Sequence, residues 1–223
     1  ERAALVIAAI AAVVVLTAIR NTTPAPTPPR TTGPREALLP RDARLWVLGL
    51  MTLFAMVPEG AVLDWGALYL TRDLGVGVQG SGLAFAFFAG TMAVVRFMGD
   101  AIRSRFGAVA TLRASGAIGA AGLLGAALSP TPGLAVGFFA ISGLGVANMV
   151  PVILSAAGNH PGVAPGTAMG TVVMVGYAGI LLAPGSIGFV AEHAGFRLTY
   201  GVLALLLLVV ALLAGRARAA DRA

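Results

Sequence analysis

The sequence contains no cysteine and no lysine, and it is poor in charged and aromatic residues. Without cysteine, these residues can form neither a disulfide nor a thiolate metal site. Only 11% of the 223 residues are charged, whereas 58% are hydrophobic, and this balance excludes a soluble domain of this length. The formal net charge of +6 rests on arginine alone. In so apolar a chain, an arginine excess is typical of cytoplasmic loops and does not indicate nucleic-acid binding.

The motifs of common enzyme sites are also missing. The sequence has no helical His-Glu-x-x-His, no phosphate-binding P-loop and no nucleophile elbow. The two histidines, His160 and His193, lie before and after one apolar run, so we expect them on opposite membrane faces and not in one metal site. The sequence therefore supports no enzyme, no cofactor and no metal.

Seven apolar segments organise the chain. The first covers residues 3–19, and six more have about the length of a membrane-spanning helix: residues 45–70, 80–98, 108–128, 134–156, 167–190 and 198–213. We therefore predict an all-α, polytopic membrane protein in which a six-helix half-bundle follows one earlier transmembrane helix. Because the sequence starts with Glu1 inside an apolar segment, we interpret it as a fragment and not as a signal peptide.

The arginines predict domains and orientation. Residues 20–44 are rich in proline and threonine and hold five arginines, so we expect a flexible cytoplasmic linker after the end of a helix at residues 1–19. Ten arginines fall on the linker side of the runs and three on the other, which places linker and C-terminus in the cytoplasm. The six-helix unit then covers residues 45–215, with a cytoplasmic tail at residues 216–223.

Two acids lie inside the run of residues 45–70. At ~1.5 Å per residue the run spans roughly 39 Å, and Glu59 falls near its middle. A lipid-facing carboxylate at that depth costs on the order of 3 kcal/mol or more, so Glu59 must face protein or water. It is our first candidate for proton coupling or substrate contact, with a structural acid paired to arginine as the open alternative. Asp64 lies nearer the outer interface, where simple hydration is favoured. Pro58 and Gly60 flank Glu59 and predict a helix break or hinge.

Several motifs resemble the major facilitator superfamily. The sequence from Arg96 to Gly107 (RFMGDAIRSRFG) looks like its loop signature, in the copy between the eighth and ninth helices. The sequence from Gly176 to Gly188 resembles its Gly-Pro helix. Residues 58–70 and 159–166 are similar to a bacterial branch often labelled fucose-permease-like. The resemblance covers essentially the whole chain and implies the end of helix six, the central loop and helices seven to twelve.

The resemblance further implies a gating loop. Asp100, Arg103 and Arg105 would form a charge-relay latch that holds the cytoplasmic gate shut in one state. Arg96 and Arg103 lie four residues before and three after Asp100, so both should share its helical face and neutralise it. A static arginine anchor at the membrane interface is the open alternative. The predicted gating residues are Arg96, Gly99, Asp100, Arg103, Arg105 and Gly107.

The remaining runs contain further candidates. Asn148 and Tyr177 are polar side chains in apolar helices, and each could contact substrate in a central cavity or bond a neighbouring helix. Pro151 and Pro184 predict additional hinges.

Aromatic and glycine patterns predict packing. Trp65 and Tyr69 lie one turn apart near the outer boundary, where an aromatic belt is favoured over ligand stacking. Small residues allow helices in lipid to approach closely, so we expect the intramembrane glycines at tight contacts, with a sliding surface as the alternative. These glycines are Gly116, Gly119, Gly122, Gly125, Gly133, Gly137, Gly143 and Gly145.

Taken together, the sequence predicts the C-terminal half of a secondary transporter. It would move a small solute by alternating access, as a proton-coupled symporter or antiporter of the inner or plasma membrane, with binding near the midplane. The expected partners are a small-molecule substrate, the lipid bilayer and the missing N-terminal half of the chain. The main alternative is a non-transporting membrane scaffold or assembly protein, in which fixed contacts would consume Glu59 and Asn148. A transporter built from smaller repeats would lack the latch.

Overall fold

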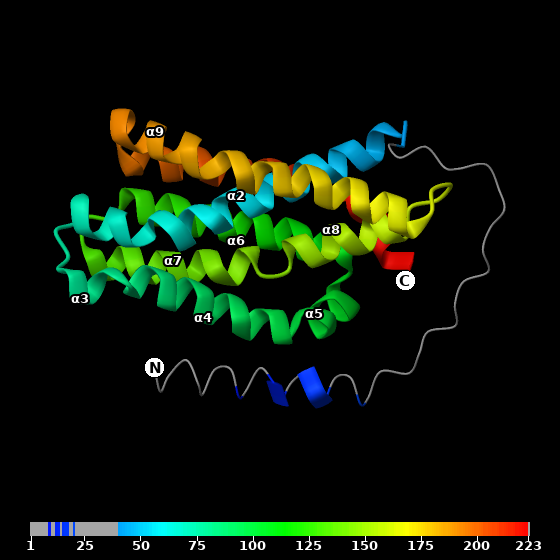
Figure 1. Ribbon diagram of the computed structural model, residues 1–223, viewed down its shortest axis with the longest axis horizontal. Helices are drawn as coiled ribbons and strands as arrows, with labels where there is room; N and C mark the ends of the chain where they lie inside the picture. Colours follow the sequence, from blue (N-terminus) through cyan, green and yellow to red (C-terminus); the bar gives the residue numbers. More distant parts are fainter. Residues whose placement is uncertain (1–8, 10–11, 14, 18–19, 21–39, 223) are drawn as a thin grey trace. The chain divides into compact units, whose positions relative to one another are not determined.

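The computed structural model describes residues 9, 12–13, 15–17, 20 and 40–222 (Figure 1). The seven described residues before position 21 are helical. The chain divides into two units, Glu1–Glu36 and Ala37–Ala223. Most of the predicted first helix and linker lies outside the described residues, so the account below concerns residues 40–222.

Residues 40–222 consist of helices joined by short turns. They are α2 (Ala43–Arg72), α3 (Val78–Ser81), α4 (Leu83–Phe97), α5 (Gly99–Phe106), α6 (Ala108–Leu128), α7 (Pro132–Val146), α8 (Met149–Gly158), α9 (Pro165–Leu213) and a final 3₁₀ segment, η1 (Ala214–Arg222). Within this range the predicted all-helical architecture is confirmed.

These helices form six membrane-length crossings. Five continuous helical stretches have the required length and hydropathy, among them Val78–Phe97 (α3 with α4) and Pro132–Gly158 (α7 with α8). The last stretch contains α9 and supplies two crossings, because Gly195 has φ 82° and ψ 157° and interrupts the helix. Figure 1 shows α9 reversing its direction, so that η1 ends beside the end from which α9 starts. Residues that carry a side chain rarely adopt such a positive φ, and this explains why glycine occupies the reversal.

Local sequence signals start the helices. The Asp42 side chain accepts a hydrogen bond from Arg44 N at 2.8 Å and caps α2. Pro132 and Pro165 each occupy the first turn of a helix, where no intrahelical partner for the missing N–H is needed. Gly107 (φ 78°) separates α5 from α6.

Glycine-mediated contacts hold the crossings together. The first part of α9 packs along α2, while α6 packs against α7 and the second part of α9, and α4 packs against α7 (Figure 1). A Cβ on Gly122 would overlap the backbone of Ser142, and one on Gly145 would overlap that of Gly119. The predicted packing role is thus confirmed for the glycines of α6 and for Gly143 and Gly145.

The same prediction is wrong for the pair Gly133 and Gly137. A Cβ built on either residue meets no atom within 4 Å in the described part of the chain. Both line an apolar cavity of about 350 Å³ near the start of α7. Their spacing alone did not reveal that they face away from the α6 interface.

An aromatic cluster fills the bundle where α2, α7 and α9 meet. Tyr69 and Tyr200 have ring centroids 5.3 Å apart, and Phe139 and Phe196 flank them. The Tyr69 hydroxyl donates to Ala126 O at 2.7 Å. Tyr69 is fully buried, so the prediction that it belongs to an aromatic belt is wrong. Its partners come from other helices, and the sequence spacing of Trp65 and Tyr69 could not show them.

The C-terminal segment packs against the bundle. In η1, Ala214, Ala217 and Ala220 are buried, and η1 contacts α6 and α8. The Asp221 carboxylate accepts a hydrogen bond from Ala108 N, at the N-terminus of α6. A negative charge there compensates the helix dipole. Residues 214–222 are therefore a structural element rather than a loose tail.

Candidate functional site

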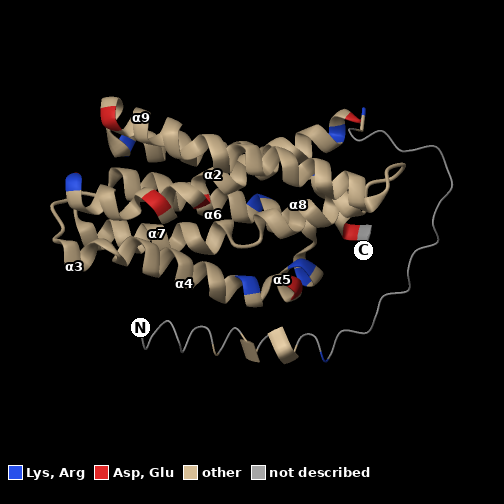
Figure 2. Cartoon of the chain, in the orientation of Figure 1, with Lys and Arg blue, Asp and Glu red and all other residues tan. Residues whose placement is uncertain are grey.

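Charged residues lie mainly near the ends of the helices, and a few lie along their length (Figure 2). Two helix interruptions face each other at one such place. The first separates α4 from α5 at Met98, and the second separates α7 from α8 at Ala147 and Asn148. Gly99 makes their close approach possible, because a Cβ there would lie 2.6 Å from Asn148 Oδ1.

Proline frees a backbone acceptor at the second interruption. Pro151 has no N–H, so the carbonyl of Ala147, four residues earlier, lacks its usual helical donor. Arg96 supplies one instead, since its Nε donates to Ala147 O at 3.2 Å. A buried carbonyl without a partner is costly, and this bond therefore anchors α4 to the start of α8.

The same arginine also binds Glu59. Arg96 Nη2 lies 3.0 Å from Glu59 Oε1, and the two side chains are 44% and 18% exposed. The prediction that Glu59 faces protein rather than lipid is consistent with this pair. The expectation that Arg96 neutralises Asp100 is wrong, because the helix is interrupted at Met98 between the two residues and Arg96 reaches across to α2.

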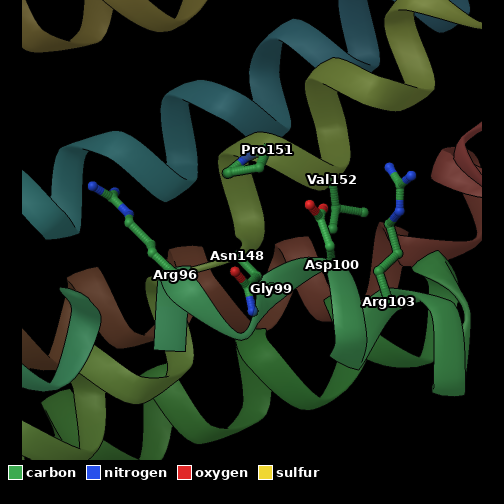
Figure 3. A pocket seen from close by; sticks show the side chains of 7 residues that line it. All are labelled: Arg96, Gly99, Asp100, Arg103, Asn148, Pro151 and Val152. Atoms are coloured by element: carbon green, nitrogen blue, oxygen red, sulfur yellow. The ribbon is translucent and has the colours of Figure 1, made fainter. Parts of the chain in front are cut away.

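A polar cavity of about 200 Å³ lies beside this pair (Figure 3). Its lining residues are Arg96, Gly99, Asp100, Arg103, Asn148, Pro151 and Val152. Four of the predicted site and gating residues (Arg96, Asp100, Arg103 and Asn148) thus contribute polar groups to one space, although they come from two separate segments. Figure 3 shows Asp100 between Asn148 and Arg103 along the cavity.

The carboxamide of Asn148 forms no side-chain hydrogen bond among the described residues, and Asn148, which is 5% exposed, lines the cavity. Its amide is therefore available to hydrogen-bond a polar group that enters the cavity. Asp100 is exposed and forms no ion pair within residues 40–222. Arg103 Nη1 donates to Ser155 Oγ at 2.7 Å. The cavity therefore offers an amide and a carboxylate to a solute.

Other predicted site residues lie outside this cavity. Asp64 is exposed on α2, and Tyr177 is 55% exposed on α9. The guanidinium carbon of Arg105 lies 5.6 Å from the Phe106 ring centroid. Of the predicted latch, the cavity is lined by Asp100 and Arg103 but not by Arg105.

The predicted hinges fall into two groups. Helix α2 continues through Pro58 and Gly60, and α9 continues through Pro184, so the break expected beside Glu59 is absent. Pro151 is the third residue of α8, directly after the interruption at Asn148. A helix that ran on from α7 into α8 would lack the bond from residue 151 to Ala147 O, and the interruption lies where that bond is missing.

The two histidines have separate environments. His160 is buried, and its Nε2 lies 3.3 Å from Asp42 Oδ2. His193 is exposed, and its Nδ1 lies 2.8 Å from Phe189 O. Among the described residues no group of three potential metal ligands is found.

Three contacts of the site were missed by sequence reasoning. They are Arg96 with Glu59, Arg96 with Ala147, and Arg103 with Ser155. The partners are separated by 37 to 52 residues. The one usable signal was Pro151, whose missing N–H implies a free carbonyl at Ala147.

Comparisons with known proteins agree with this architecture. The family model described as Major Facilitator Superfamily matches residues 2–184 and 61–223. An uncharacterized MFS-type transporter of Yersinia pestis is 34% identical over 170 residues, which are 75% of this chain and 44% of that relative. Membrane protein MosC of Rhizobium meliloti is 34% identical over 155 residues, which are 70% of this chain and 38% of MosC. The chain thus spans less than half the length of these relatives.

A solved structure shares the fold. The crystal structure of peptide transporter POT in complex with sulfate superposes with a TM-score of 0.68, at 18% identity, over 80% of this chain and 38% of POT. Six membrane-length crossings, matched to part of a solved structure of the same fold, define a multi-pass membrane protein. The chain belongs to the Major Facilitator Superfamily.

Proposed function

We propose that this chain is the C-terminal half of a proton-coupled transporter that moves a small polar solute by alternating access. The observation that carries the proposal is the Glu59–Arg96 pair beside a cavity that contains the unpartnered amide of Asn148. Intramembrane ionisable residues are costly and are typical of ion and substrate pathways. The other wall of the solute site would come from the rest of the full-length protein.

Glu59 is the proton-coupling acid in this proposal. When ionised, it holds Arg96 at 3.0 Å. Proton uptake by Glu59 would remove the charge attraction and leave the Arg96 guanidinium, still bonded to Ala147 O, available to the solute. Proton binding and solute binding would then be linked through one side chain.

Asp100, Arg103 and Arg105 form the gating loop in this proposal. Arg103 is tied to Ser155, whereas Asp100 is exposed and has no ionic partner within residues 40–222. That free carboxylate is suited to bind a cationic group or a helix N-terminus of the other half in one state and to release it in the other. The static-anchor alternative would instead leave Asp100 without a partner in both states.

Several finer assignments belong to the same proposal. Residues 20–44 would be the cytoplasmic linker after a helix at residues 1–19, and the C-terminus would face the cytoplasm of the inner or plasma membrane. Residues 58–70 and 159–166 support the fucose-permease-like branch. Pro58, Gly60, Pro151 and Pro184 remain proposed bending points, and Tyr177 remains a proposed solute contact from an exposed face.

The scaffold alternative required fixed contacts on both Glu59 and Asn148. Glu59 is paired, but the amide of Asn148 forms no side-chain hydrogen bond among the described residues and lines the cavity. Membership of a transporter family also disfavours a scaffold.

The test uses Glu59→Gln in the full-length protein, reconstituted in proteoliposomes with a pH gradient. We expect the variant to lose gradient-driven accumulation while it still exchanges solute, because glutamine cannot take up the proton. Asp64→Asn is the matched control, since Asp64 is an exposed acid on the same helix. Unchanged gradient-driven transport by Glu59→Gln would remove Glu59 from the coupling role.

A further inference from the structure

A second cavity lies next to the polar one and has the opposite character. It has a volume of about 430 Å³ and lies between the α4–α5 segment and α6, which are neighbours in the bundle. Its apolar lining includes Ile102, Phe106, Ala110, Ala114, Ile118 and Leu144. We call it the α5–α6 groove.

A positive charge is held beside the α5–α6 groove. Phe106 lines the groove, and the guanidinium carbon of Arg105 lies 5.6 Å from the centroid of its ring. Arg105 is exposed and forms no ion pair with an acid within residues 40–222. An apolar slot next to an uncompensated arginine is complementary to an amphiphile with an anionic head.

The position of Asn148 indicates which side the groove faces. Asn148 lines both cavities, whereas Gly99, which approaches it closely, lines only the polar one. The polar cavity must face the other half of the transporter, a step that rests on the proposed function. The α5–α6 groove uses different positions of the α4–α5 segment (Val95, Ile102 and Phe106). With the polar cavity turned to the other half, the groove would open to the bilayer.

We propose that the α5–α6 groove binds an acyl chain of an anionic phospholipid whose phosphate pairs with Arg105. The exposed residues Ala110, Ala114 and Ile118 recur every four positions on α6 and form a continuous apolar wall for the chain. The phosphate adds a charge-assisted bond that a zwitterionic lipid provides less well, because its head carries a compensating cation.

The experiment is native mass spectrometry of the detergent-purified full-length protein, with phosphatidylglycerol or phosphatidylcholine of identical acyl chains added. We expect preferential retention of phosphatidylglycerol. Arg105→Gln should reduce this preference about fivefold, the effect of one basic side chain near an anionic lipid, whereas Arg105→Lys should largely keep it.

Ala114→Trp should fill the groove and reduce retention of both lipids. Ala117→Trp, at an exposed position of α6 outside the groove lining, should leave the retention of both lipids unchanged.

Two results would overturn the proposal. One is equal lipid retention by Ala114→Trp and Ala117→Trp. The other is an unchanged phosphatidylglycerol preference in Arg105→Gln, a test that does not depend on whether Ala114→Trp folds. Glu59→Gln should bind lipid normally, so the lipid site and the proton-coupling role can fail independently.

Discussion

At the residue scale, Arg96 connects three helical segments. It belongs to α4, donates through Nε to Ala147 at the α7–α8 interruption, and pairs through Nη2 with Glu59 on α2. Only a guanidinium, with several donors in a fixed plane, reaches both acceptors at once. The same side chain thus maintains the shape of the polar cavity and holds the proposed proton-coupling acid.

Replacement of Arg96 should reveal both roles. In Arg96→Gln, the Ala147 carbonyl loses its donor and Glu59 loses its partner, so we expect a loss of about 1–3 kcal/mol in the free energy of unfolding. The measurement is the unfolding midpoint of the purified full-length protein. Arg216→Gln, at an exposed position of η1, is the control and should change stability by no more than about 0.5 kcal/mol.

The Glu59 contribution can be separated with a double mutant. In the Glu59→Gln background, Arg96→Gln should cost less than in the wild type, because the ion pair is already absent. Identical costs in both backgrounds would show that the pair at 3.0 Å contributes nothing to stability.

At the element scale, two helix interruptions lie at the polar cavity. The breaks at Met98 and Asn148 bring Gly99 against the Asn148 amide, whereas α6 is continuous and packs through its glycines. In lipid, apolarity does not drive association between helices, so close packing through small residues carries this role. The α6–α7 contact therefore depends on individual glycines.

Two substitutions on α7 test that dependence. Gly145→Ala should destabilise the protein by about 1–3 kcal/mol, because its Cβ would overlap the backbone of Gly119, which cannot rotate away. Gly137→Ala, on the same helix, meets nothing within 4 Å and should be neutral or stabilising by about 0.5–1 kcal/mol. Thermal unfolding of the two full-length variants gives the comparison. Equal midpoints would contradict the packing role of Gly145.

At the scale of the whole molecule, residues 40–222 form one side of a transport site in the proposed function. The polar cavity is bounded by two segments of this chain, and Arg96 beside it is 44% exposed. The chain covers less than half of its relatives' length, and in the proposed full-length protein the other half would cover this face. Orientation in the membrane then decides which end of the cavity opens to the cytoplasm.

Cysteine labelling measures this orientation. We expect Ala194→Cys, just before the reversal at Gly195, to react with an impermeant maleimide added outside intact cells, in a full-length protein otherwise free of cysteine. Pro161→Cys, in the turn between α8 and α9, should react only after permeabilisation. Both positions are exposed. The opposite pattern would contradict the orientation inferred from ten arginines on one side and three on the other.

Much of the fold was predictable from the sequence. Long apolar runs fix the crossings, because a helix in lipid must satisfy its own backbone and needs about 20 apolar residues to span the bilayer. The arginine-rich stretch from Arg96 to Gly107 and the acid inside residues 45–70 also marked the region of the site. The glycines of α6 correctly predicted close packing.

The sequence by itself determined the number of crossings and the presence of an acid that lipid cannot solvate. Only the tertiary structure decided that Arg96 binds Glu59 instead of Asp100, that Tyr69 is buried, and that Gly137 lies outside the α6 contact. The physical reason is that hydropathy acts on each segment separately, whereas a partner 37 residues away is chosen by how two helices pack and where one of them is interrupted.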